Sequence, residues 1–303
     1  MPIDPVKTVV LTDSTADLPP HVLKEQNIKV IPMTITVDGR KYTDGFDLTT
    51  DSFYKLLEKI SDAPTTDPPS VEQFTEIYGN LLSEYDQILS IHVSSRLSKT
   101  FSNAREAVVH GSKFFREVRM KNKRFHPYRV RVVDSQHVSG GLGIVVIRAA
   151  EALRQGHNFG EVYGAAEDMH KHVHYIFTLK DLKYMRRSNR VPAMSYVLAK
   201  MIDLKPIIEM DKGVLSSIDR VRGYEQAVEK ILEHFNTHKA AQRNDRIIVV
   251  YAGHAALQQE NLSLVRIVKA IRDRGFQVIE STVGPTIGTH CGPEAIGIAY
   301  YSA

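Results

Sequence analysis

Residues 8–26 read TVVLTDSTADLPPHVLKEQ, and this stretch sets a pattern that the rest of the chain repeats. Thr8–Leu11 is a short apolar, β-branched run of the kind that forms strands. It ends in the polar residues Thr12–Thr15. The proline pair at 19–20 then favours a helix to about Gln26, because proline is well tolerated in a first helical turn. A strand, a polar loop and a helix in this order predict an α/β unit.

Strand-like and helix-like segments alternate along the remaining chain. We expect strands at residues 29–37, 41–43, 87–93, 129–134, 175–179, 204–209, 214–220, 246–251, 277–282 and 295–301. We expect helices at residues 53–60, 71–84, 98–110, 143–153, 159–172, 182–187, 224–235 and 261–271. This alternation predicts two α/β domains, with a largely parallel sheet in residues 1–165 and a mixed sheet in residues 166–303.

The composition limits the class of protein. Of the 303 residues, 43% are hydrophobic and 24% are charged, as in an ordinary globular chain. The formal charge of +4 is too small to indicate a specific nucleic-acid partner. A single cysteine, Cys291, fits a reducing compartment. With no signal-like N-terminus and no long apolar run, we expect a cytoplasmic protein that touches membranes at most transiently.

The common enzyme motifs are absent from the sequence. It contains no GxxxxGK[ST] phosphate loop, GxGxxG fingerprint, HExxH zinc motif or GxSxG elbow. We therefore expect no catalytic residue, no metal site and no cofactor. Gly140, Gly141 and Gly143 follow a strand and open a helix, where backbone amides can meet an anion. Close packing is the commoner use of such glycines.

Four loops rich in hydroxyl side chains each follow a strand or precede a helix. They are residues 12–15, 64–70, 94–100 and 284–290. In an open α/β sheet, ligands bind beyond the carboxyl ends of the strands, so these loops can converge on one site. Each loop taken alone is better explained by the capping of helices and turns. Four such loops together favour a site for a polar group.

Six segments occur in the order seen in one known family. They are VVLTDSTADLP (9–19), PTTDPPS (64–70), ILSIHVSSRLSKTFSNA (88–104), VRVVDSQHVSGGLG (130–143), LKDLKYMRRSNRV (179–191) and VGPTIGTHCGPEAIGI (283–298). The chain resembles the DegV family over essentially its whole length. That resemblance implies a long-chain fatty acid bound between two α/β domains. It also implies a non-enzymatic role as the acyl-binding subunit of a separate, ATP-dependent fatty acid kinase, holding the acyl phosphate product.

The resemblance implies where the carboxylate is held. The family's threonine and serine contacts correspond to Thr66 and Ser98. Its histidine corresponds to His290 and its basic residue to Arg190. The hydroxyl residues that accompany the first two complete the expected site, and they are Thr65, Ser94 and Ser95.

Several positions depart from the family pattern. Lys99 replaces a glycine beside the head-group serine, and either adds charge there or points to solvent. Ser188 and Asn189 replace the two glycines before Arg190, and Glu294 replaces a further glycine. These changes bear most on Arg190 and on the way a kinase would dock.

An apolar stretch after Pro192 is the expected lining of the acyl tunnel, which we assign to the second half of the chain. Its members are Met194, Val197, Leu198, Met201, Ile202 and Leu204. Methionine adapts well to an irregular chain. The alternative is that these residues form ordinary core.

Residues 113–131 hold eight Lys and Arg with interleaved aromatic side chains, namely Phe114, Phe115, Phe125 and Tyr128. This stretch supports an alternative function, in which a regulatory protein binds nucleic acid or a membrane surface. Most charge runs are solvated faces, and of the two partners a membrane surface suits a fatty-acid exchanger better.

Overall fold

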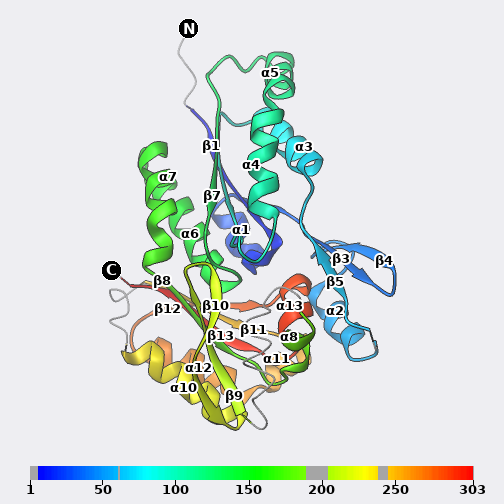
Figure 1. Ribbon diagram of the computed structural model, residues 1–303. Helices are drawn as coiled ribbons and strands as arrows, with labels where there is room; N and C mark the ends of the chain where they lie inside the picture. Colours follow the sequence, from blue (N-terminus) through cyan, green and yellow to red (C-terminus); the bar gives the residue numbers. More distant parts are fainter. Residues whose placement is uncertain (1–5, 61, 189–203, 238–244, 303) are drawn as a thin grey trace.

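The computed structural model describes residues 6–60, 62–188, 204–237 and 245–302, and it confirms the predicted α/β fold (Figure 1). The first half carries a parallel sheet in the order β2-β1-β6-β7. Its strands are β1 (Thr8–Asp13), β2 (Ile28–Ile31), β6 (Gln87–His92) and β7 (Arg129–Asp134). A small antiparallel sheet, in the order β4-β3-β5, comprises β3 (Thr34–Val37), β4 (Arg40–Thr43) and β5 (Thr65–Asp67).

The second half forms a mixed sheet of six strands in the order β10-β9-β8-β13-β11-β12. Strands β11 and β12 pair in parallel, and the other pairings are antiparallel. The strands are β8 (Val173–Thr178), β9 (Leu204–Asp211), β10 (Val214–Arg222), β11 (Arg246–Tyr251), β12 (Gln277–Thr282) and β13 (Ile296–Tyr301). A parallel first sheet and a mixed second sheet are as the sequence predicts.

Helices cover both faces of the parallel sheet (Figure 1). One face carries α3 (Val71–Leu82), α4 (Thr100–His110) and α5 (Ser112–Lys121), and the other carries α6 (Gly140–Arg154) and α7 (Phe159–Asp168). Successive side chains of a strand point to opposite faces of the sheet, so one strand contributes to the core on both faces. Val9 and Leu11 of β1 join the core under α3 to α5, whereas Val10 between them joins the core under α6.

Of the remaining helices, α1 (Pro20–Glu25) packs against β2 of the parallel sheet, and most others lie around the small sheet and the mixed sheet. The others are α2 (Thr50–Leu57), α8 (Lys183–Arg187), α10 (Tyr224–Thr237), α11 (Ala255–Glu260), α12 (Leu262–Asp273) and α13 (Pro285–Cys291), with short 3-10 turns η1 (Ser14–Ala16) and η2 (Met169–Lys171). None of the described helices combines the length and hydrophobicity that crossing a membrane requires.

Helix α6 packs against strands of both large sheets, so the two halves share one core. A side chain at Gly140 would lie 3.0 Å from the Ala299 Cβ atom of β13, and one at Gly143 would lie 2.9 Å from the Ile248 Cδ1 atom of β11. These glycines therefore serve close packing of the helix. The predicted division between residues 165 and 166 falls inside α7, between the last strand of the parallel sheet and the first strand of the mixed one.

The sequence does not predict the helices α5 and α11, and three expected segments take a different form. The strand expected at 29–37 is two strands in different sheets, because Pro32 between them has no N–H to donate to a ladder. The turn expected at 64–70 contains the short strand β5, which pairs with β3. The loop expected at 284–290 is largely the helix α13, which starts at Pro285, a favoured first-turn residue.

Helix α13 approaches α2 at Gly288, and this contact allows a direct test. A methyl group there would lie 2.7 Å from both the Phe53 Cε1 atom and the Tyr54 hydroxyl oxygen, so Gly288→Ala should lower the free energy of unfolding by about 1–3 kcal/mol. Gly164→Ala in α7 is the matched control. Nothing lies within 4 Å of its added carbon, and it should stabilise by about 0.5–1 kcal/mol. Equal effects in chemical denaturation would contradict the packing of α13 on α2.

Candidate functional site

A cavity lies between the carboxyl ends of the parallel strands and the mixed sheet, and it spans about 850 Å³ when the solvent space at its mouth is included. Its apolar lining comprises Met33, Val93, Leu97, Val138, Tyr175, Phe177, Met185, Leu215, Val250, Val283, Ile287, Cys291, Ala295 and Ile296. Its polar lining comprises Thr15, Thr66, Ser98, Ser188, Thr286 and His290. The wall is thus mostly hydrocarbon, with hydroxyl groups from several loops.

Both halves of the chain contribute to the apolar wall of this cavity. Met33 and Leu97 come from the first half, and Tyr175 and Phe177 of β8 from the second. The two rings stack with their centroids 5.2 Å apart and their planes 22° apart. In the stretch expected to line a tunnel, residues 194–202 fall outside the described part of the chain. Leu204 is described, and lies half-buried in β9 without lining the cavity.

A histidine lies at one polar end of the cavity with a hydroxyl group at each ring nitrogen. The Nε2 atom of His290 on α13 is 3.0 Å from the Thr66 hydroxyl, and its Nδ1 atom is 3.0 Å from the Ser188 hydroxyl. Thr66 is buried because β5 pairs along β3 and turns this side chain inward. An imidazole can donate at one nitrogen and accept at the other, so this group can adjust to a ligand on either side.

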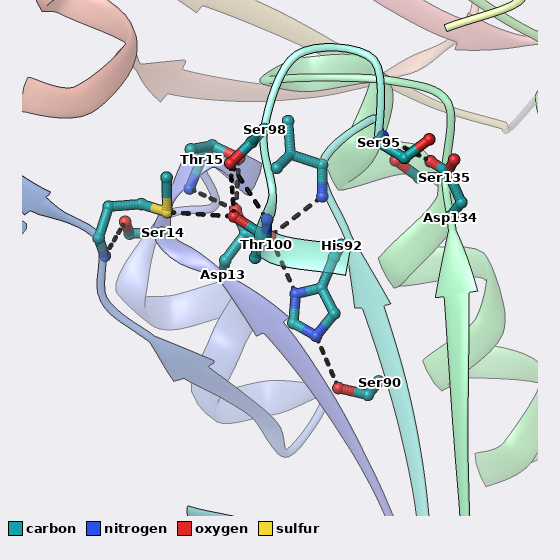
Figure 2. Close-up of polar contacts among 12 residues, drawn as sticks. Asp13, Ser14, Thr15, Ser90, His92, Ser95, Ser98, Thr100, Asp134 and Ser135 are labelled. Atoms are coloured by element: carbon teal, nitrogen blue, oxygen red, sulfur yellow. Dashed lines mark hydrogen bonds and ion pairs between the residues drawn. The ribbon is translucent and has the colours of Figure 1, made fainter. Parts of the chain in front are cut away.

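Ser98 lines the cavity from the loop before α4 (Figure 2). Its oxygen accepts a hydrogen bond of 3.2 Å from the amide of Thr100, the first residue of α4, and lies 2.8 Å from the Thr100 hydroxyl. The Thr100 hydroxyl also lies 3.7 Å from the Met33 sulfur atom. When the Thr100 hydroxyl donates to Ser98, the Ser98 proton can be offered to a ligand.

The other expected head-group residues lie elsewhere. Ser94 is fully buried and donates a 2.7 Å hydrogen bond to the Gly213 carbonyl in the β9–β10 turn, which ties the two halves together. The side chains of Ser95 and Thr65 are exposed. Thr65 lines a hollow that adjoins the cavity at Thr66, Ser188 and His290. Arg190 falls outside the described residues.

A buried polar chain holds the loop that carries Thr15 (Figure 2). The Asp13 carboxylate accepts hydrogen bonds from the amides of Thr15 and Val93, at 3.1 and 3.0 Å, and lies 3.0 Å from the His92 Nδ1 atom. His92 Nε2 lies 2.7 Å from the Ser90 hydroxyl. This Ser-His-Asp order resembles a hydrolase triad, but all three side chains are fully buried. It therefore fixes the loop and offers no nucleophile to a substrate.

Two buried carboxyl groups join the loops of the first half to the start of α13. Asp17 accepts hydrogen bonds from the Ser139 hydroxyl at 2.6 Å and the Gly284 amide at 2.8 Å. Asp44 accepts from the hydroxyls of Ser14 and Thr286, at 2.8 and 2.6 Å. Burial raises the pKa of Asp44 above its ordinary value, against these hydrogen bonds. Both acids position the helix that bears His290.

Sequence reasoning did not assign the cavity residues Thr15 and Thr286, although both lie in the loops it selected for their hydroxyl content. It also missed Tyr175 and Phe177. Their spacing of two residues on a predicted strand places both side chains on one face, which was the available signal.

Comparison with known proteins agrees with this geometry. A family model described as an uncharacterised protein of the DegV family matches residues 7–303. The chain belongs to the DegV family. A DegV domain-containing protein of Caldanaerobacter subterraneus is 29% identical over 294 residues, covering 97% of this chain and 98% of the relative.

Solved DegV structures share the fold over nearly the whole chain. A DegV-family protein from Thermus thermophilus, described as binding fatty acid, superposes with a TM-score of 0.83 at 27% identity, over 98% of this chain and 100% of that one. DegV from Bacillus subtilis, described as a fatty-acid-binding protein, superposes with a TM-score of 0.82 at 25% identity and the same coverage. Both comparisons support the two-domain DegV architecture of this chain.

Two departures from the DegV pattern have a structural account. Lys99 is exposed at the start of α4 and does not line the cavity, so of its two expected roles the structure supports the solvent-facing one. Glu294 has a φ of 59°, a left-handed value that glycine adopts without strain, and its carboxylate lies 2.7 Å from Lys180 Nζ.

The carboxyl group of Asp17 makes stability depend on pH. Burial raises its pKa from an ordinary 3.8 to about 8, although the hydrogen bonds from Ser139 and Gly284 act in the opposite direction. The folded protein then keeps a proton that the unfolded chain has lost. The Asp17 contribution to stability is therefore full below pH ~4 and is lost as pH rises through about 8, by up to ~1.4 kcal/mol per unit.

Asp17→Asn should flatten this dependence, because an amide has no proton to lose. Denaturant unfolding from about pH 5 to about pH 9 should show stability falling more steeply in the wild type than in the variant. Parallel curves for the two proteins would contradict a protonated Asp17 in the folded state.

Proposed function

We propose that this protein binds a long-chain fatty acid in the cavity, with the carboxylate at Thr66, Ser98 and His290. The observation that carries the proposal is a mostly hydrocarbon cavity, of whose polar residues Thr66, Ser188 and His290 also line an adjoining hollow. The fatty-acid binding described for the Thermus thermophilus and Bacillus subtilis relatives supports it.

The division of the wall matches the division of the ligand. Burying an acyl chain contributes about 0.8 kcal/mol per CH₂, so about 14–16 carbons contribute roughly 10–12 kcal/mol before association entropy is subtracted. A carboxylate only accepts hydrogen bonds, and the hydroxyls of Thr66 and Ser98 can donate them. Such charge-assisted bonds contribute about 1.5–3 kcal/mol each. The tail supplies affinity, and the head group sets orientation.

This assignment sets which groups donate and which accept in the hydrogen bonds around His290. If Thr66 donates to the carboxylate, its oxygen can accept from His290 Nε2, 3.0 Å away. The Nδ1 atom of the ring then accepts from the Ser188 hydroxyl at 3.0 Å. The histidine thus orients one ligand contact.

We further propose that a separate ATP-dependent kinase phosphorylates the carboxylate in the cytoplasm, and that this protein holds the acyl phosphate. The hollow beside His290 is lined by Thr65, Tyr184, Arg187 and Ser188. The exposed Arg187 can compensate the added negative charge of an acyl phosphate. The carboxylate is itself the nucleophile, so the DegV chain need not supply one. The absence of a phosphate loop from its sequence is consistent with ATP bound by the kinase. We assign Arg190 to the contact with the kinase. We also propose that the protein contacts a membrane transiently, as the source of the fatty acid.

Replacing both Thr66 and Ser98 with alanine tests the head-group assignment. Losing two charge-assisted hydrogen bonds should weaken fatty-acid binding by at least about 100-fold, given about 1.5 kcal/mol or more for each. Titration of the delipidated protein with a fluorescent fatty acid measures this.

Ser95→Ala with Ser102→Ala is the control, because both side chains are exposed hydroxyls on the same loop and helix. It should bind as the wild type does. Unchanged affinity in the Thr66 and Ser98 double variant would show that the carboxylate is held elsewhere.

A further inference from the structure

The end of the molecule farthest from the cavity carries exposed apolar and basic side chains. We call residues 6–7 and 113–131 the basic pole, which comprises α5, the following loop and the segment that enters β1 (Figure 1). Phe125 is 83% exposed, Met120 70% and Val6 53%. Large apolar side chains that lie close together and exposed on a protein surface indicate an interaction site.

The charge of the basic pole is strongly one-sided. Residues 113–131 hold eight Lys and Arg and a single acid, Glu117. Two of the eight, Arg119 and Arg124, are bound by the buried Asp86 carboxylate at 2.9 and 2.7 Å. The other six are exposed, and they are Lys113, Arg116, Lys121, Lys123, Arg129 and Arg131. Glu84 at the end of α3 is the neighbouring exposed acid. The excess of positive charge is local, since the whole chain carries only +4.

Asp86 also fixes the shape of the basic pole. Its carboxylate accepts a 3.0 Å hydrogen bond from the Lys7 amide, beside Val6. Arg119 donates to the carbonyls of Tyr85 and His126, at 2.9 and 2.6 Å, and so ties the loop that presents Phe125 to the sheet. The apolar side chains are therefore held outward by a buried ion-pair network.

The basic pole lies opposite the cavity because of the sheet's topology. Strands β1, β6 and β7 run parallel, and all three begin at the basic pole. Their carboxyl ends carry Thr15, Val93 and Ser98 toward the cavity. A surface bound at the basic pole leaves the cavity and its adjoining hollow uncovered.

We propose that the basic pole docks on an anionic lipid surface, with Met120 and Phe125 entering the interfacial region. The exposed cations face the head groups, apart from Arg131, whose guanidinium lies over the Tyr163 ring of α7. Charge complementarity selects this partner, since each Lys or Arg near an anionic bilayer strengthens binding by about fivefold. Exposed Phe and Met beside the cations favour a bilayer over a nucleic acid, because apolar side chains gain by burial among acyl chains. The docked protein offers its cavity to a partner in solution.

Sedimentation with lipid vesicles tests the proposal on the full-length protein. Wild-type protein should bind vesicles of equal parts phosphatidylglycerol and phosphatidylcholine, bind pure phosphatidylcholine vesicles weakly, and dissociate as salt is raised. Met120→Ser with Phe125→Ser should reduce binding about tenfold. Lys121→Gln with Lys123→Asn should reduce it about 10- to 30-fold. Asparagine suits position 123, where φ is 55°.

Matched controls come from surfaces far from the basic pole. Leu262→Ser with Val265→Ser removes apolar side chains that are 82% and 56% exposed on α12, and Lys41→Gln with Lys59→Gln removes two exposed charges. Both controls should bind vesicles as the wild type does.

Three results would overturn the proposal: no preference for anionic vesicles, equal losses in the control variants, or tighter binding to a DNA duplex than to vesicles. Fatty-acid retention, measured on the same samples, should be unchanged in the pole variants. That second measurement separates failure of docking from failure of the proposed fatty-acid binding.

Discussion

The joint between the first-half loops and the start of α13 is the contact on which the site depends. Asp17 receives hydrogen bonds from Ser139 of the segment before α6 and from Gly284, and Asp44 receives them from Ser14 and Thr286. Buried carboxyl groups are costly unless they are hydrogen-bonded or protonated, and here both conditions contribute. The joint holds α13 against β3 and β5, and so brings His290 within 3.0 Å of Thr66.

The cavity is the space that the parallel sheet, the mixed sheet and α6 leave unfilled beside that joint. The glycines of α6 let the helix approach both sheets closely, whereas the stacked rings of Tyr175 and Phe177 face the open space. Among the residues that the structure describes, the polar side chains of the wall are hydroxyls and His290. A molecule with a long hydrocarbon tail and a small acidic end satisfies both parts of such a wall. The chemistry of the proposed ligand is thus set by packing as much as by the head-group residues.

Much of this architecture could be predicted from the sequence. Apolar runs with hydroxyl-rich ends, such as the one from Thr8 to Thr15, predicted strands and converging loops, and the order of six segments indicated the family. The position of a side chain relative to the cavity could not be predicted in the same way. Ser94 and Ser98 lie in one loop, yet Ser94 binds the Gly213 carbonyl of a distant turn while Ser98 lines the cavity. Likewise, Pro32 in the sequence disfavours a continuous strand, but only the tertiary structure shows that β2 and β3 on its two sides belong to different sheets.

The most direct test of the account is mass spectrometry of the protein purified untagged from its host, under native conditions and then after lipid extraction. The account predicts an added mass on the intact chain that matches a long-chain fatty acid, recovered in the extract in amounts comparable to the protein. A native mass equal to that of the bare chain, with no fatty acid in the extract and none taken up on addition, would contradict it.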